Sequence, residues 1–206
     1  MRNFHLGLVA FAAALAMPLS ALAESNITTG AGSPLTATAR LDFKIVVPKI
    51  IYVRIGTGAN LAANGTIDLL TFTVPAANVG DGTVISGVGG DIGGGVVTAR
   101  VIGNNGAITF GSTTTGPLSD GVGDTISFAQ MAVAVAANTS VLPLASPALV
   151  DGATTNIALT PNIGTKVTNL DAKWTFTYLN GNIVPQGTYG GVNTNGGRVT
   201  YTASMP

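Results

Sequence analysis

Residues 35–45 read Leu-Thr-Ala-Thr-Ala-Arg-Leu-Asp-Phe-Lys-Ile, and apolar and polar side chains alternate along the whole stretch. Successive side chains of a β-strand point to opposite faces, so a strand built from this stretch has one apolar and one polar face. An apolar face needs a second sheet to cover it, which predicts a packed β-protein. The apolar face consists of Leu35, Ala37, Ala39, Leu41, Phe43 and Ile45.

The same alternation recurs along the chain, and no segment shows a sustained helical period. Asn104-Asn105-Gly106 is a tight-turn signal and predicts a hairpin between residues 96–102 and 107–110. The alanine-rich run 131–137 leaves a short helix open, although its alternating flanks favour a strand. The other predicted strands are 49–55, 67–74, 125–135, 156–160, 171–178 and 197–205.

Glycine, proline and Asp-Gly signals place loops at residues 78–95, 111–123 and 138–154. Roughly eight or nine strands separated by such loops are typical of an immunoglobulin-like sandwich. We therefore expect an all-β fold, an antiparallel β-sandwich in one domain that spans residues 24–206.

The N-terminus has the layout of a secretory signal peptide. Arg2 precedes an apolar run from Leu6 to Ala16, and Ala21-Leu22-Ala23 supplies small residues before a cleavage point. The run is about half of the roughly 20 residues that a membrane-spanning helix needs, which disfavours an anchor. We expect residues 1–23 to be removed and the protein to be exported to the periplasm, the cell surface or the medium.

The composition argues against an enzyme. The chain has no cysteine, and its single histidine, His5, lies in the predicted signal peptide. The mature chain then lacks the commonest general base, the thiol nucleophile and the usual zinc ligands, so no cofactor or metal is expected. Loss of Arg2 leaves eight of the nine basic residues beside nine acidic ones. This near-neutral chain has no electrostatic footprint for nucleic acid or anionic lipid.

Two further kinds of site compete with ordinary structural roles. Asp81 and Asp91 lie in a glycine-rich stretch, but their spacing does not match a calcium loop, and Asp-Gly pairs commonly make turns. Four aromatic residues could form a sugar-stacking platform: Trp174, Tyr178, Tyr189 and Tyr201. The alternation places Trp174, Phe176 and Tyr178 together on one face of a predicted strand, which favours a place in the core instead.

The C-terminal region resembles the end of bacterial fimbrial subunits of the spore-coat-U-like and chaperone–usher types. The similarity lies in Val184-Pro185-Gln186-Gly187-Thr188-Tyr189 and in the alternating strand that follows, residues 198–204. The cysteine pair common in those subunits is absent here. The resemblance implies an immunoglobulin-like sandwich that accepts a strand from a neighbouring subunit.

These observations predict a structural subunit of a surface filament or coat that associates with copies of itself or with other subunits by β-strand addition. The strand 35–45, with the six apolar residues named above, is the predicted donor. A strand that stays in its own sheet would show the same pattern, so both possibilities remain open. The alternative function is an adhesin or carbohydrate-binding module that uses the loops 78–95 and 111–123.

Overall fold

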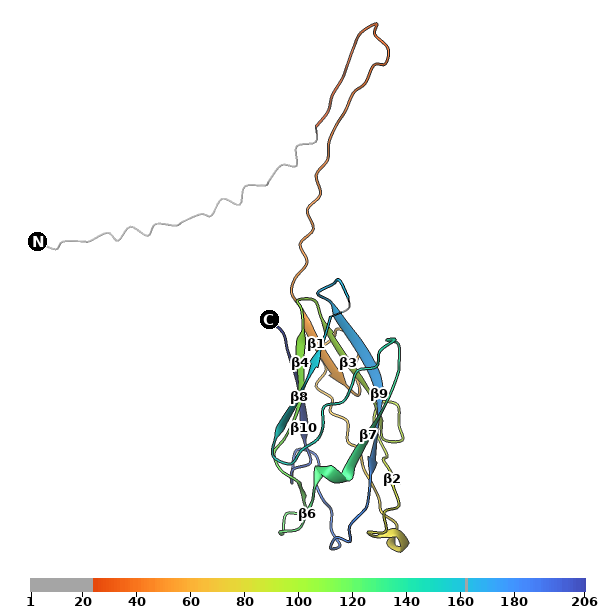
Figure 1. Cartoon of the computed structure of the whole chain (residues 1–206), viewed down its shortest axis with the longest axis vertical. Coiled ribbons are helices and arrows are strands. Elements are labelled where there is room, and N and C mark those ends of the chain that lie inside the picture. Colours follow the sequence, from red (N-terminus) through yellow and green to blue (C-terminus); the bar gives the residue numbers. More distant parts are fainter. Residues whose placement is uncertain (1–23, 162) are drawn as a thin grey trace, which may run out of the picture. The chain divides into compact units, whose positions relative to one another are not determined.

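The computed structural model describes residues 24–161 and 163–206 (Figure 1). The predicted signal peptide lies outside these residues. The chain divides into two compact units between Val47 and Pro48. The first unit has no strand within residues 24–47, and every strand of the described residues lies in the second unit.

The second unit is built from two main antiparallel sheets. The first sheet is centred on β9 (Thr168–Tyr178), which pairs with β3 (Val96–Gly103) on one edge and with β7 (Met131–Ala136) on the other. The strands β1 (Ile51–Ile55) and β2 (Ile85–Ser86) complete it by pairing with β3 and β9 respectively.

The second sheet has the order β10-β4-β8. Its central strand β4 (Ile108–Thr114) pairs with β10 (Val199–Ser204) and β8 (Thr154–Leu159). A small separate pair and two short 3₁₀ helices lie in the connections: β5 (Leu118–Ser119), β6 (Thr125–Ile126), η1 (Ala76–Asn78) and η2 (Phe128–Gln130).

The two sheets are held together by one apolar core. Trp174 of β9 is fully buried, and its ring centroid lies 6.2 Å from that of Phe110 in β4 and 5.5 Å from that of Tyr201 in β10. The indole Nε1 donates to the Leu144 carbonyl at 2.8 Å, so the one polar atom of this side chain is satisfied. The predicted all-β sandwich is confirmed, with ten strands in the described part of the chain rather than the eight or nine expected.

The strand order follows the immunoglobulin pattern in its central part. The neighbours β1, β3, β9 and β7 stand in the order A-B-E-D, and β4 and β10 occupy the positions C and F. In that pattern a strand G lies beside F. Within the described residues, β10 has β4 as its only ladder partner.

The predicted hairpin between residues 96–102 and 107–110 is wrong. Both segments are strands, but β3 belongs to the first sheet and β4 to the second, and they share no ladder. Asn104 explains the divergence, because its side chain accepts from the Ile50 amide at 2.9 Å and donates to the Pro48 carbonyl at 2.7 Å. The turn is thus hydrogen-bonded to the residues just before β1, and the chain continues from it into the second sheet.

Three other predictions need correction. The predicted strand 67–74 is reduced to a single bridge between Thr71 and Val88. The predicted loop 111–123 is partly strand, since β4 continues to Thr114 and β5 follows. The predicted loop 78–95 contains β2. A fourth prediction, the strand 125–135, is confirmed only in part: η2 separates β6 from β7, and the alanine-rich run forms the strand β7.

Candidate functional site

The predicted donor segment is extended, exposed and unpaired. Residues 35–45 have an extended backbone but no ladder partner within the described chain. A β-strand is assigned by its hydrogen bonds to a neighbouring strand. The segment 35–45 therefore has the side-chain alternation of a strand but is not assigned as one. Each of the six apolar residues is exposed, and Leu41, Phe43 and Ile45 expose 68%, 85% and 87% of their surface.

The N-terminal unit doubles back on itself, as the red-to-orange trace in Figure 1 shows. The Arg40 guanidinium donates two hydrogen bonds to the Glu24 carboxylate, at 2.7 and 2.8 Å. The Thr28 hydroxyl donates to the Thr36 carbonyl at 2.8 Å. Arg40 holds the pKa of the Glu24 carboxyl below its usual value, and Glu24 raises the pKa of Arg40.

Two edge strands of the sandwich lie next to each other on one side of the second unit. Within the described residues, β1 pairs only with β3 and β10 only with β4, and β1 approaches β10. Each strand therefore has one edge whose N–H and C=O groups lack ladder partners among the described residues. Such an edge can accept a further strand.

The side chains along this seam are apolar and incompletely covered. Val53 and Ile55 from β1 pack against the core while remaining partly exposed, and so do Tyr201, Ala203 and Met205 at the C-terminal end. Burial raises the pKa of the Tyr201 hydroxyl well above its usual value. Tyr201, Ala203 and Met205 lie at two-residue spacing and so form one apolar row. The apolar side chains of a strand added beside β10 would pack next to this row.

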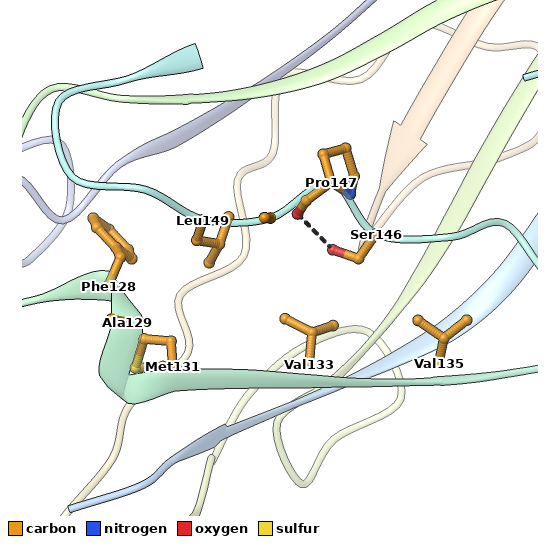
Figure 2. A pocket seen from close by; sticks show the side chains of 9 residues that line it. Phe128, Ala129, Met131, Val133, Val135, Ser146, Pro147 and Leu149 are labelled. Carbon is orange, nitrogen blue, oxygen red and sulfur yellow. Dashed lines mark hydrogen bonds between the residues drawn. The ribbon is translucent and has the colours of Figure 1, made fainter. Parts of the chain in front are cut away.

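A second open place lies along β7, between that strand and residues 146–149 (Figure 2). It is a groove of about 290 Å³. Figure 2 shows Met131, Val133 and Val135 along β7, with Pro147 and Leu149 on the segment across from them. Sequence reasoning treated residues 138–154 only as a loop and missed this groove. The two-residue spacing of Met131, Val133 and Val135 was the available signal.

Asp171 is the most strongly held carboxylate of the second unit. It lies on the outer face of β9, 2% exposed. Its Oδ1 accepts from the amides of Thr139 and Ser140 at 2.9 and 2.8 Å, and its Oδ2 accepts from the Asn138 amide group and the Thr139 hydroxyl. Burial opposes ionisation, but these hydrogen bonds outweigh it and hold the pKa of Asp171 far below its usual value. Asp171 thus fixes the turn at 138–140 to the sheet.

The remaining candidate acids make turns. Asp81 accepts from the Thr83 amide at 2.7 Å, and Asp91 accepts from the Thr98 amide at 2.7 Å. Asp120 accepts from three successive amides between Val122 and Asp124. No group of three or more His, Cys, Asp or Glu side chains that could hold a metal occurs in the described part of the chain. Asp81 and Asp120 have the turn role that Asp commonly takes beside glycine, and Asp91 ties the glycine-rich loop to β3.

The predicted core position of Trp174 is confirmed, and the stacking platform is not formed. Trp174, Phe176 and Tyr178 are all buried. Of the other predicted platform residues, Tyr201 packs against the core, and Tyr189 is partly exposed with its hydroxyl donating to the Pro185 carbonyl at 2.8 Å.

The glycine-rich stretch 78–95 packs closely upon itself and upon β9. The Gly95 carbonyl accepts from the Phe176 amide at 3.0 Å. A Cβ at Gly95, where φ is +75°, would lie 2.9 Å from the Gly87 Cα. Glycine is required here because two backbones approach each other, which is a structural use of the residue.

No family model and no curated protein matches this sequence. Among the described residues, no helix has the length and apolar character to cross a membrane. The assignment of function therefore rests on the exposed N-terminal segment and the open strand edges.

Proposed function

We propose that the protein is an exported structural subunit of a surface filament or coat that assembles by β-strand addition. The exposed alternating segment before Pro48 of one copy pairs with the free edge of β10 in the next copy. The donor's apolar face then covers the seam between β1 and β10, and its backbone completes the ladder of the second sheet.

The observation that carries this proposal is the exposure of Leu41, Phe43 and Ile45, each above two-thirds. Large apolar side chains at two-residue spacing form one continuous face, which a soluble monomer rarely leaves in water. Full burial of one such side chain contributes about 1.5–3 kcal/mol, so three contribute on the order of 5–9 kcal/mol before the entropy of association is subtracted.

The edge of β10 is favoured as the acceptor over that of β7. β10 stands at position F, beside the place that strand G takes in an immunoglobulin sandwich. The partly exposed Tyr201, Ala203 and Met205 already face the core there. The groove beside β7 is bounded on its other side by residues 146–149, which form no strand. A strand added at β7 could therefore form ladder hydrogen bonds with β7 but not with residues 146–149.

The test is the oligomeric state of the full chain exported by its own N-terminus. The wild-type protein should form linear polymers that survive unheated detergent electrophoresis and are visible by negative-stain microscopy. Leu41→Asp and Phe43→Asp should leave a folded monomer, because they place a charge on the face that must be buried. Asp42→Ser, on the opposite face, is the matched control and should still polymerise.

A wild-type protein that stays monomeric at high concentration would contradict the proposal. So would Asp variants that fail to fold, since that result would assign the segment to its own core. A monomer that retained a sugar ligand would favour a binding module instead.

A further inference from the structure

We infer that the donated strand is residues 41–47 alone, and that residues 24–40 stay outside the acceptor as a hairpin. This inference rests on the proposed function and narrows it. The apolar residues up to Ala39 then belong to the hairpin, and those from Leu41 onward belong to the donated strand.

The contacts within the N-terminal unit define the hairpin. Glu24 meets Arg40, and Thr28 meets Thr36. Thr28 lies four residues after Glu24, and its partner Thr36 lies four residues before Arg40. Both contacts therefore fit one antiparallel register. The turn end agrees, since a Cβ placed on Gly30 would lie 3.7 Å from Leu35 Cδ1. With residues 1–23 removed on export, as proposed above, Glu24 is the first residue of the other arm, so the register ends at its partner Arg40.

Side-chain size divides the segment at the same point. Inside the hairpin, positions 37 and 39 are alanines, which bury little apolar surface. Beyond it, Leu41, Phe43, Ile45 and Val47 are all large, and Val47 exposes 72% of its surface. The anchors available for a second copy therefore lie after Arg40.

The acceptor edge has room for this part only. β10 has six residues, and paired antiparallel strands advance together by about 3.4 Å per residue. Residues 41–47 match that length, whereas residues 35–47 are about twice as long as the edge they would pair with. A ladder that starts at position 41 uses the whole edge and all four large side chains.

The downstream boundary is set by Pro48. Proline has no N–H to donate, so a ladder bond cannot continue there. Only residues 48–50 then separate the donated strand from β1, which begins at Ile51. Neighbouring copies would be joined by a three-residue connection, which predicts a stiff filament.

The absence of native cysteine makes the register measurable. Lys44→Cys and Thr38→Cys lie on the same polar face of the N-terminal segment, and each is combined with Thr202→Cys on the outer face of β10. Under mild oxidation, the Lys44→Cys pair should cross-link successive copies into a ladder on a non-reducing gel. The Thr38→Cys pair should give at least tenfold less cross-linked product.

A second measurement uses charge. Ile45→Asp should reduce polymer at least tenfold, and Leu35→Asp should leave polymer yield unchanged. If Leu35→Asp abolishes assembly, or the Thr38→Cys pair cross-links while the Lys44→Cys pair does not, the division at Arg40 is wrong although strand addition stands. If wild-type protein forms no polymer and neither cysteine pair cross-links, strand addition itself is wrong, and this inference falls with it.

Discussion

Residues 35–45 and residues 171–178 carry the same alternating pattern, and the structure treats them in opposite ways. In β9, Trp174, Phe176 and Tyr178 are buried, and the strand has neighbours on both edges. In the N-terminal unit the corresponding apolar face, which includes Phe43, is exposed to water and has no ladder neighbour among the described residues. Alternation identifies a face that can be buried, but the partner that buries it is a property of the whole fold. Where the described fold offers no partner, the proposed function supplies one from a second copy.

The largest expected difference between the two regions is the cost of removing an aromatic ring. Trp174→Ala should destabilise the second unit by about 3–5 kcal/mol, because a fully enclosed side chain leaves a cavity. Phe43→Ala should change the stability of the monomer by less than about 0.5 kcal/mol, as surface substitutions do. Urea unfolding of both variants, kept monomeric at low concentration, measures the two values. Similar losses would mean that both segments belong to one core.

A smaller effect is expected at Asp171, on the outer face of β9. Asp171→Asn should cost about 2–3 kcal/mol at neutral pH, since its amide group would face the donors of Asn138 and Thr139. Asp42→Asn, in the exposed segment, is the matched control and should cost nothing measurable.

The pH dependence of this effect has a definite sign. The folded pKa of Asp171 lies below the unfolded value of about 3.9, so its contribution is complete above that value and is lost as the pH falls toward the folded pKa. The stability gap between wild type and Asp171→Asn should therefore shrink below about pH 4. Urea unfolding at pH 7 and pH 3 tests this, and a gap that widens in acid would contradict the assigned cause.

Sequence reasoning succeeded where one local signal decides the outcome. The alternation of residues 171–178 placed Trp174 in the core, and the flanks of the alanine-rich run predicted β7. It failed where the outcome depends on distant partners. Asn104-Asn105-Gly106 specifies that the chain reverses, but the contacts of Asn104 with residues 48–50 decide which sheet follows.

The candidate site was half predictable for the same reason. The proposed donor face, from Leu35 to Ile45, could be predicted directly from the alternation. The proposed acceptor edge could not, because the lack of a second ladder neighbour for β10 among the described residues depends on how the nine other strands are arranged. The groove beside β7 was missed because its far wall, residues 146–149, has no regular pattern.

A still smaller effect is expected when the N-terminal unit is removed from the monomer. Trypsin should cut the monomeric full chain after Arg40 and Lys44, which are exposed and unpaired in any ladder. The product should unfold within about 0.5 kcal/mol of the intact chain, because no buried side chain is lost. In the polymer, Lys44 should be protected while Arg40 is still cut. Mass spectrometry of timed digests measures both, and equal protection of the two sites would contradict the division at Arg40.

The smallest effect is expected at the Glu24–Arg40 ion pair. Both groups are solvent-exposed, and exposed pairs contribute little because water and salt screen them. Glu24→Gln should therefore leave the urea midpoint of the monomer and the polymer yield unchanged, with Arg40→Gln as the matched partner. The pair then reports the register of the hairpin without acting as a latch on the donor. A rise in polymer yield with both variants would show that the hairpin restrains residues 41–47. The alternating segment of the monomer would then be held back by its own hairpin, rather than free to pair.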